Sequence, residues 1–131
     1  MLHKTLSALA LACCVLAPAH AAPETQITPL LSMPLQDIPG KEALMLTVSY
    51  PPGGSDAVHR HDAHVFVYVL EGSIQMQARG KPAVTLTPGQ TFYESPEDVH
   101  VVGRNASATA PARFLVFFVK KLGVAPVLPA Q

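Results

Sequence analysis

Short stretches in which hydrophobic and polar residues alternate recur along most of the chain. Successive side chains of an extended strand point to opposite faces of a sheet, so this alternation is typical of a strand with one buried face. Alternation and β-branched or aromatic residues predict strands over residues 43–50, 58–61, 65–70, 73–78, 83–86, 91–94, 99–103 and 112–121. The last strand contains the apolar run FLVFFV, which suits burial on both faces.

Proline and glycine separate these predicted strands. The sequence PPGG at residues 51–54 ends the first strand, because proline cannot donate to a ladder and glycine frees the backbone to turn. Glu71 and Gly72 predict a tight turn, and therefore a hairpin between the strands at 65–70 and 73–78. Many short strands with close turn signals, and no convincing helix after the first 21 residues, predict an all-β sandwich or barrel.

The first 21 residues have the composition of a secretory signal. Lys4 provides a positive start, residues 5–16 are apolar but too short to cross a bilayer, and Ala19-His20-Ala21 has the small-x-small form of a cleavage site. We therefore expect a signal peptide over residues 1–21 and a mature protein that is periplasmic or secreted.

Both cysteines, Cys13 and Cys14, lie within this signal segment. The mature chain would then contain no disulfide, thiolate ligand or cysteine nucleophile. A lipoprotein acylated at one of the two cysteines is the weaker alternative, because the residue before Cys14 is itself a cysteine instead of a small residue.

Length and charge restrict the classes of partner. The chain has 131 residues, 49% of them hydrophobic, which is enough for one domain with a modest core. The formal net charge is zero and the basic residues are spread along the sequence, so we expect no nucleic-acid partner and no stable membrane insertion.

Proline-rich segments flank the predicted domain at residues 40–122. Prolines at positions 23, 29, 34 and 39 oppose a helix and predict an extended arm over residues 22–39, which adds an edge strand to the sheet or to a partner. A disordered leader is the alternative for residues 23–28. The tail at residues 123–131 is predicted to lie on the surface or across a partner subunit, and we expect a homodimer.

Histidines gather between Pro52 and Gly72. His59 and His61 share one face of an extended strand, because they are two residues apart, and they form a potential metal-ligand pair. A transition metal needs at least three protein ligands, and His100, about forty residues further on, is the candidate for the third.

The two stretches that hold these histidines resemble the paired motifs of the cupin superfamily. Residues that match the motifs are Gly53, His59, His61 and Gly72 in the first, and Gly89 and His100 in the second. The departures are Val65 at the usual glutamate position, Asp98 at a usual glycine, and Pro96 and Asn105, each one place late. The resemblance covers about residues 40–120 and implies a double-stranded β-helix, or jelly-roll barrel.

The resemblance implies that His59, His61 and His100 bind a divalent transition metal, with Fe, Mn, Cu, Ni and Zn all open. Because Val65 cannot coordinate, a fourth ligand would be His64, Glu94 or water. His64 would need a bulge to face His61, and Glu94 would reach from the second motif, where it is also suited to orient a ligand or bind substrate. We expect three histidines with exchangeable water, and Glu94 and His64 as candidate catalytic residues.

Three neutral imidazoles would leave positions on the metal open for dioxygen, water or a substrate. Cupins that resemble this chain include dioxygenases, isomerases and proteins that bind ligands without turnover. We therefore predict an exported metal-binding cupin that acts on a small molecule, with oxidoreductase activity of the dioxygenase type as the leading hypothesis. The alternatives are a non-catalytic module that binds a small molecule or sugar, and a metal-scavenging protein.

Overall fold

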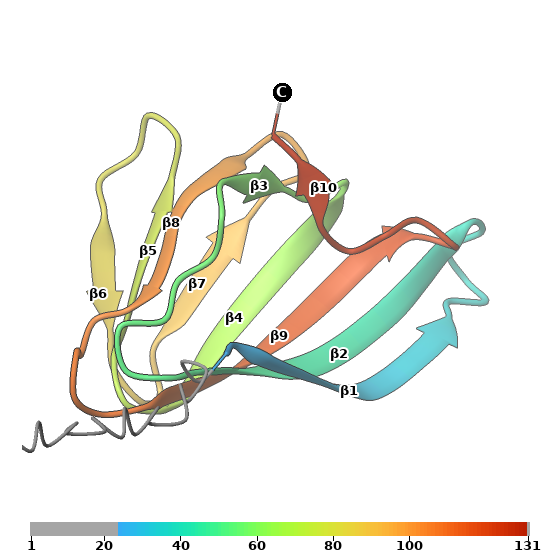
Figure 1. Ribbon diagram of the computed structural model, residues 1–131. Coiled ribbons are helices and arrows are strands. Elements are labelled where there is room, and N and C mark those ends of the chain that lie inside the picture. The colour runs from blue at the N-terminus through green and yellow to red at the C-terminus, as the bar shows by residue number, and fades with distance from the viewer. Residues whose placement is uncertain (1–23, 131) are drawn as a thin grey trace, which may run out of the picture.

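The computed structural model describes residues 24–130, which form two five-stranded sheets with antiparallel pairing throughout (Figure 1). The strands of the first sheet, in spatial order, are β1 (Gln26–Pro34), β2 (Lys41–Tyr50), β9 (Ala112–Lys121), β4 (Ala63–Glu71) and β7 (Thr91–Glu94). Those of the second are β10 (Leu128–Pro129), β3 (His59–Arg60), β8 (Val99–Asn105), β5 (Ile74–Ala78) and β6 (Val84–Leu86). The all-β jelly-roll prediction is confirmed.

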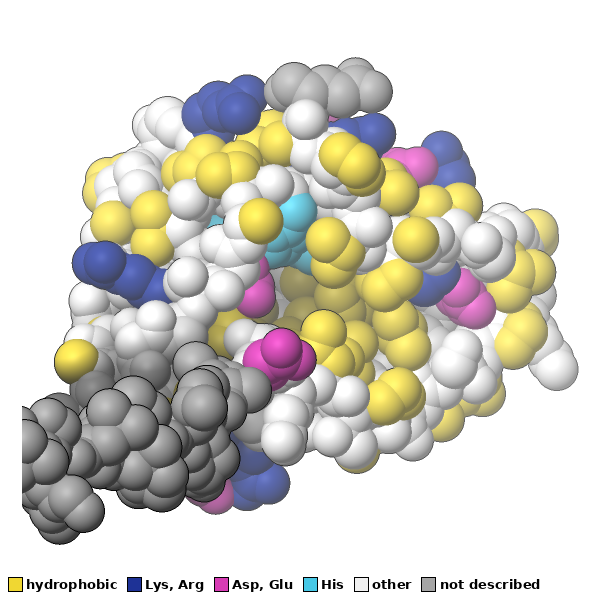
Figure 2. All heavy atoms as spheres, in the orientation of Figure 1, with side chains coloured by type: hydrophobic (Ala, Val, Ile, Leu, Met, Phe, Trp, Pro, Cys, Tyr) yellow, Lys and Arg dark blue, Asp and Glu magenta, His cyan; other side chains and the backbone are white. Residues whose placement is uncertain are grey.

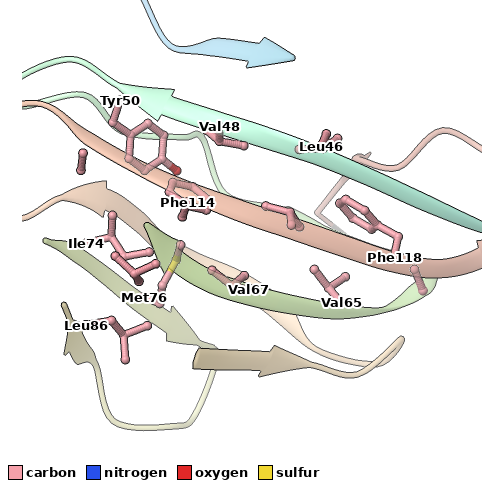
Figure 3. Close-up of a cluster of buried hydrophobic side chains, with 14 residues drawn as sticks. Leu46, Val48, Tyr50, Val65, Val67, Ile74, Met76, Leu86, Phe114 and Phe118 are labelled. Atoms are coloured by element: carbon pink, nitrogen blue, oxygen red, sulfur yellow. The ribbon is translucent and has the colours of Figure 1, made fainter. Parts of the chain in front are cut away.

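The core lies between the inner faces of the two sheets (Figure 3). Strand β4 alternates as its sequence predicts: Val65, Val67 and Val69 are at most 3% exposed, whereas Phe66 and Tyr68 point to the outer face. In the apolar run of β9, Leu115, Phe117 and Val119 are only half-buried, so burial on both faces, as the run predicted, is incomplete. The inner face therefore holds the core and the outer face of β4 stays partly open.

The predicted hairpin at Gly72 is wrong. Strands β4 and β5 belong to different sheets, because the chain crosses from one sheet to the other at this glycine. Gly72 has a φ of 72°, and a Cβ there would lie 2.4 Å from the carbonyl oxygen of Pro111. A tight corner packed against the start of β9 has the same glycine signal as a hairpin turn, so the local sequence did not separate the two.

Both flanking segments join the sheets. Strand β1 pairs with β2 from Gln26 onwards, so the predicted arm adds an edge strand to the sheet. The alternative of a disordered leader over residues 23–28 is therefore wrong for residues 26–28. The tail pairs through β10 with β3, which places it beside the histidines (Figure 1). The predicted signal peptide, with Cys13 and Cys14, lies outside the described residues. Within the described part of the chain, no helix is long and apolar enough to cross a membrane.

Candidate metal centre

Two strands of the second sheet place the three predicted histidines together. His59 in β3 is the direct cross-strand partner of His100 in β8, and His61 follows one residue after β3. The ring centroid of His59 lies 4.8 Å from that of His61 and 4.9 Å from that of His100. One ring nitrogen from each of the three lies within 4.8 Å of the others.

Backbone carbonyls fix the tautomers of the first two rings. Nδ1 of His59 lies 2.8 Å from the carbonyl oxygen of Ala57, and Nδ1 of His61 lies 2.5 Å from that of Pro126. A carbonyl only accepts, so each Nδ1 donates its hydrogen and each neutral ring has its lone pair on Nε2. These two Nε2 atoms are 3.2 Å apart, so their lone pairs face each other.

His100 has the same arrangement with the opposite nitrogen. Its Nε2 lies 2.5 Å from the carbonyl oxygen of Val102 and donates to it, which leaves the lone pair on Nδ1, 3.3 Å from Oε1 of Glu94. Burial lowers the pKa of His100 to about 4, and the neighbouring His59 adds to the effect. Burial also lowers the pKa of His61. Both rings are therefore neutral at pH 7 and can act as ligands.

Glu94 completes a set of four lone-pair donors. Its side chain comes from β7, the residue is 1% exposed, and Oε2 lies 3.6 Å from Nε2 of His61. Oε2 has no hydrogen-bond partner among the described residues. Burial, helped by the Asp98 and Asp56 carboxylates, raises the pKa of Glu94 to about 7. A buried carboxyl group that faces lone pairs needs either a proton, which it would donate to one of them, or a cation among these atoms.

This donor set fits a divalent transition metal. Three imidazole nitrogens and one carboxylate are ligands that zinc, copper, iron, manganese and nickel accept. The second nitrogen of every ring donates to a backbone carbonyl, which is the usual way in which proteins orient histidine ligands. His59, His61, His100 and Glu94 are therefore the residues that could hold the metal.

Glu94 and Val65 are direct cross-strand partners in β7 and β4. Both side chains point inward, and both residues are 1% exposed. The carboxylate of Glu94 thus enters the interior beside the position at which the first cupin motif usually has its glutamate. The expectation of a site with three histidines and water becomes one with three histidines and a neighbouring carboxylate.

The structure does not bring His64 to this cluster. His64 lies on the outer face of β4, where its Nδ1 is 2.7 Å from the hydroxyl of Tyr93 and the two rings stack. The irregularity in the pairing of β4 lies between Val69 and Glu71, so no bulge turns His64 inward. Simple alternation, which placed His64 opposite to His61, was the correct interpretation.

A largely apolar cavity of about 390 Å³ opens beside the histidines. Figure 2 looks into its mouth, where histidine side chains border one side of a hollow lined largely by hydrophobic atoms. Its walls come from β2, β4 and β9, whereas its mouth includes Ile27 and Val127, which are 60% and 50% exposed. The four candidate ligands all lie on its surface, so a bound metal would face this space.

Two features of the site had not been predicted. The carbonyl of Pro126, in the tail, orients His61. The carboxylate of Asp56 lines the cavity and accepts a hydrogen bond from the buried hydroxyl of Tyr50. A backbone carbonyl has no sequence signal, and Asp56 resembled a loop residue after the glycines, although an acidic residue three positions before His59 was a signal available in the sequence.

The family model described as Cupin domain matches residues 46–118, more than half of the chain. No curated protein sequence matches. A similar solved structure is the DMSP lyase DddQ from Ruegeria pomeroyi DSS-3, with 27% identity, a TM-score of 0.58 and coverage of 66% of this chain. The chain spans 42% of the length of that enzyme.

Two further structures match more of this chain, 82% in each case. A cupin-like protein from Thermotoga maritima MSB8 has 20% identity and a TM-score of 0.63, with 76% of its own length covered. The polyketide cyclase RemF from Streptomyces resistomycificus has 23% identity and a TM-score of 0.61, with 72% of its length covered. At these identities the likeness concerns the fold alone.

Proposed function

Because the chain belongs to the cupin family, we propose that it is an exported metal-dependent oxidoreductase of the dioxygenase type, with His59, His61, His100 and Glu94 as the metal ligands. The observation that carries the proposal is the convergence of three imidazole nitrogens, each ring held by a backbone carbonyl, with the buried carboxylate of Glu94 beside His61 and His100. A divalent metal bound there would supply Lewis acidity and, for a redox-active ion such as iron or copper, electron transfer to dioxygen.

The residues of the chain itself would bind and orient the substrate. The apolar walls of the cavity keep water away from the reacting end of a bound molecule and hold its body by contact. Asp56 lines the same cavity, and its Oδ2 accepts the hydroxyl hydrogen of Tyr50, which fixes the carboxylate in place. We assign to Asp56 the acceptance of a proton from a substrate hydroxyl.

Metal content tests the ligand assignment. Each of His59→Ala, His61→Ala, His100→Ala and Glu94→Ala should lower the stoichiometric metal content of the purified protein, because each removes one of four donors. His64→Ala is the matched control, since this histidine is exposed on the outer face of β4, and it should retain full metal. Full metal content in two of the three cluster histidine variants would contradict the assignment.

Oxygen consumption separates the enzyme from the non-catalytic binding module. In a panel of phenols and thiol-acids, the iron-loaded protein should consume dioxygen with uncharged phenolic substrates, and His61→Ala should not. Saturable ligand binding without oxygen uptake or product would favour the binding module.

Export is the second part of the proposal. It is supported by the positive start, the apolar stretch and the Ala19-His20-Ala21 sequence in the first 21 residues. Intact-mass measurement of the protein from the periplasm or medium should give a chain that begins near Ala22 and contains no cysteine. A mass that includes Cys13 or Cys14 with an attached lipid would contradict the expectation of a soluble exported protein.

A further inference from the structure

The walls of the cavity beside the metal centre carry little polarity. Most lining side chains are aliphatic or aromatic, and the deepest of them include Val65, Val67, Met76 and Phe118, each at most 3% exposed. Apart from the four candidate ligands, Asp56 is the one charged side chain among the described lining residues. The polar groups of a bound molecule therefore have partners at the metal end and at Asp56, and the remainder of the molecule contacts hydrocarbon.

The charges around the cavity are also balanced without a substrate. No lysine or arginine lines it in the described part of the chain. A divalent metal would bring two positive charges, the buried carboxylate of Glu94 offsets one, and the exposed carboxylate of Asp56 adds a second negative charge at the edge of the cavity, so the formal sum is zero. With three histidines alone the site would be strongly positive and would attract anions, but Glu94 removes half of that charge.

A substrate whose oxygens occupy the metal end, and which carries a carboxylate at its other end, would consequently bury that charge against the apolar wall without a counter-charge. Transfer of an ionised carboxylate from water into an apolar cavity is strongly unfavourable unless a cation or several donors receive it. An uncharged molecule loses only the hydration of its polar end, which the metal and Asp56 replace. The cavity volume of about 390 Å³ is within the usual range for small-molecule sites.

We propose that this site takes an uncharged, largely apolar small molecule that presents hydroxyl or carbonyl oxygens at one end, and that it rejects molecules with a carboxylate at the other end. The inference rests on the proposed metal centre, and it deepens that function by naming the class of substrate. Ile27 and Val127 at the mouth contribute apolar contacts to the outer end of the molecule.

The test compares three probes with the same chelating group on protein loaded with zinc, which is not redox-active. Methylcatechol and protocatechuamide are uncharged, whereas protocatechuate has a carboxylate at the position of the amide. Calorimetric titration should give dissociation constants at least about tenfold lower for the two uncharged probes than for protocatechuate, because only the carboxylate must be desolvated without a partner. Zinc content is measured before and after titration.

A cation at the mouth should change this selectivity. Val127→Lys puts an ammonium at an exposed position of the cavity rim, where the variant is expected to fold, and should reduce the preference against protocatechuate. Leu122→Lys is the matched control, since Leu122 is 53% exposed and does not line the cavity. The control should retain the wild-type selectivity.

The outcomes separate this inference from the metal-site proposal. Failure to bind zinc stoichiometrically would overturn the proposed metal centre itself. Stoichiometric zinc, combined with equal or tighter binding of protocatechuate, or with no binding of any of the three probes, would overturn the substrate class alone.

Discussion

Glu94 and Val65 face the same part of the interior from neighbouring strands, and at this pair the chain departs from the cupin motif. Val65 occupies the usual glutamate position but can neither coordinate nor accept a proton. Glu94 supplies a carboxylate from the opposite strand, where its ionised form has no donor among the described residues for Oε2. Such a group costs folding free energy, and a bound cation offsets that cost.

An exchange of the two residues tests whether the carboxylate has moved from one strand to its neighbour. Glu94→Val alone should lose metal affinity, because it removes the anionic ligand. The double variant Val65→Glu/Glu94→Val should recover a substantial part of that affinity, since it returns the carboxylate to the usual motif position at unchanged composition. Competition with a chelator measures the metal affinities of the single and the double variant. A double variant that binds metal no more tightly than Glu94→Val would contradict the idea that the carboxylate has moved between the strands.

Metal affinity should depend on pH through Glu94. Its pKa of about 7 means that a proton occupies the carboxylate below this pH and must leave when the metal binds. The affinity should therefore fall by up to about tenfold per pH unit on acidification below pH 7 and level off above it. The His100 pKa of about 4 means that this imidazole starts to compete only at lower pH.

The Glu94→Gln variant is the control for this pH dependence. It should bind metal more weakly, and between about pH 6 and 7 its affinity should vary less than that of the wild type. If the metal affinities of the wild type and of Glu94→Gln changed equally with pH, a group other than Glu94 would release the proton.

At the scale of strands, alternation and turn residues predicted most of the architecture. Residues 91–94 form β7 as predicted, and residues 43–50 and 65–70 fall within β2 and β4. The same signals failed at Gly72, because the choice between a hairpin and a corner depends on the packing of the residues around Ala112 and not on the turn itself. Local sequence therefore predicted where strands begin and end better than which strands pair.

The site was predictable to a similar degree. The spacing of His59 and His61, with the motif resemblance at His100, brought together three residues that the structure also brings together. The position of Glu94 depends on the register between β4 and β7, which no local pattern fixes. The role of the Pro126 carbonyl depends on where the tail returns, so neither contact could be derived from the sequence alone.

A buried ion pair holds this tail against the sheet. Lys120 at the end of β9 is 5% exposed, pairs with Glu42 of β2 and donates to the carbonyl oxygens of Lys121 and Val124. The backbone N–H of Gly123 also donates to Glu42. These contacts fix the chain just before Pro126, whose carbonyl orients His61.

Replacement of Lys120 should therefore act on the metal centre from a distance. Lys120→Met leaves Glu42 without its cation and releases the tail, so both the melting temperature and the metal affinity should fall. Lys121→Met, which removes an exposed pair with Asp62, is the matched control and should change both only slightly. Thermal melts measure the melting temperature, and chelator competition measures the metal affinity. An unchanged metal affinity in Lys120→Met would contradict a role of the tail in orienting the metal ligands.

At the scale of the whole molecule, β1 is an unusual edge. All nine of its residues are exposed, none is charged, and Ile27, Leu30 and Met33 are each about half exposed or more. Edge strands of soluble proteins are usually protected by charges or by a covering element. Ile27 also lines the mouth of the cavity, so whatever covers β1 would border the substrate site.

We expect a second copy of this chain to cover β1, giving a homodimer in which the two cavity mouths lie near the interface. The formal net charge is zero for the full chain and −1 (8 − 9) from Ala22 onwards, so electrostatic repulsion opposes self-association little, and the apolar side chains on β1 supply the area to be buried. Sedimentation velocity should show a dimer at micromolar concentration.

Leu31→Lys should weaken the association of the two copies by at least about tenfold, because an ammonium would be buried in the contact. Val84→Lys, on β6 in the other sheet, should leave association unchanged. A wild-type protein that remains monomeric at about 100 μM, well above the concentrations at which specific interfaces normally assemble, would contradict a dimer built on β1.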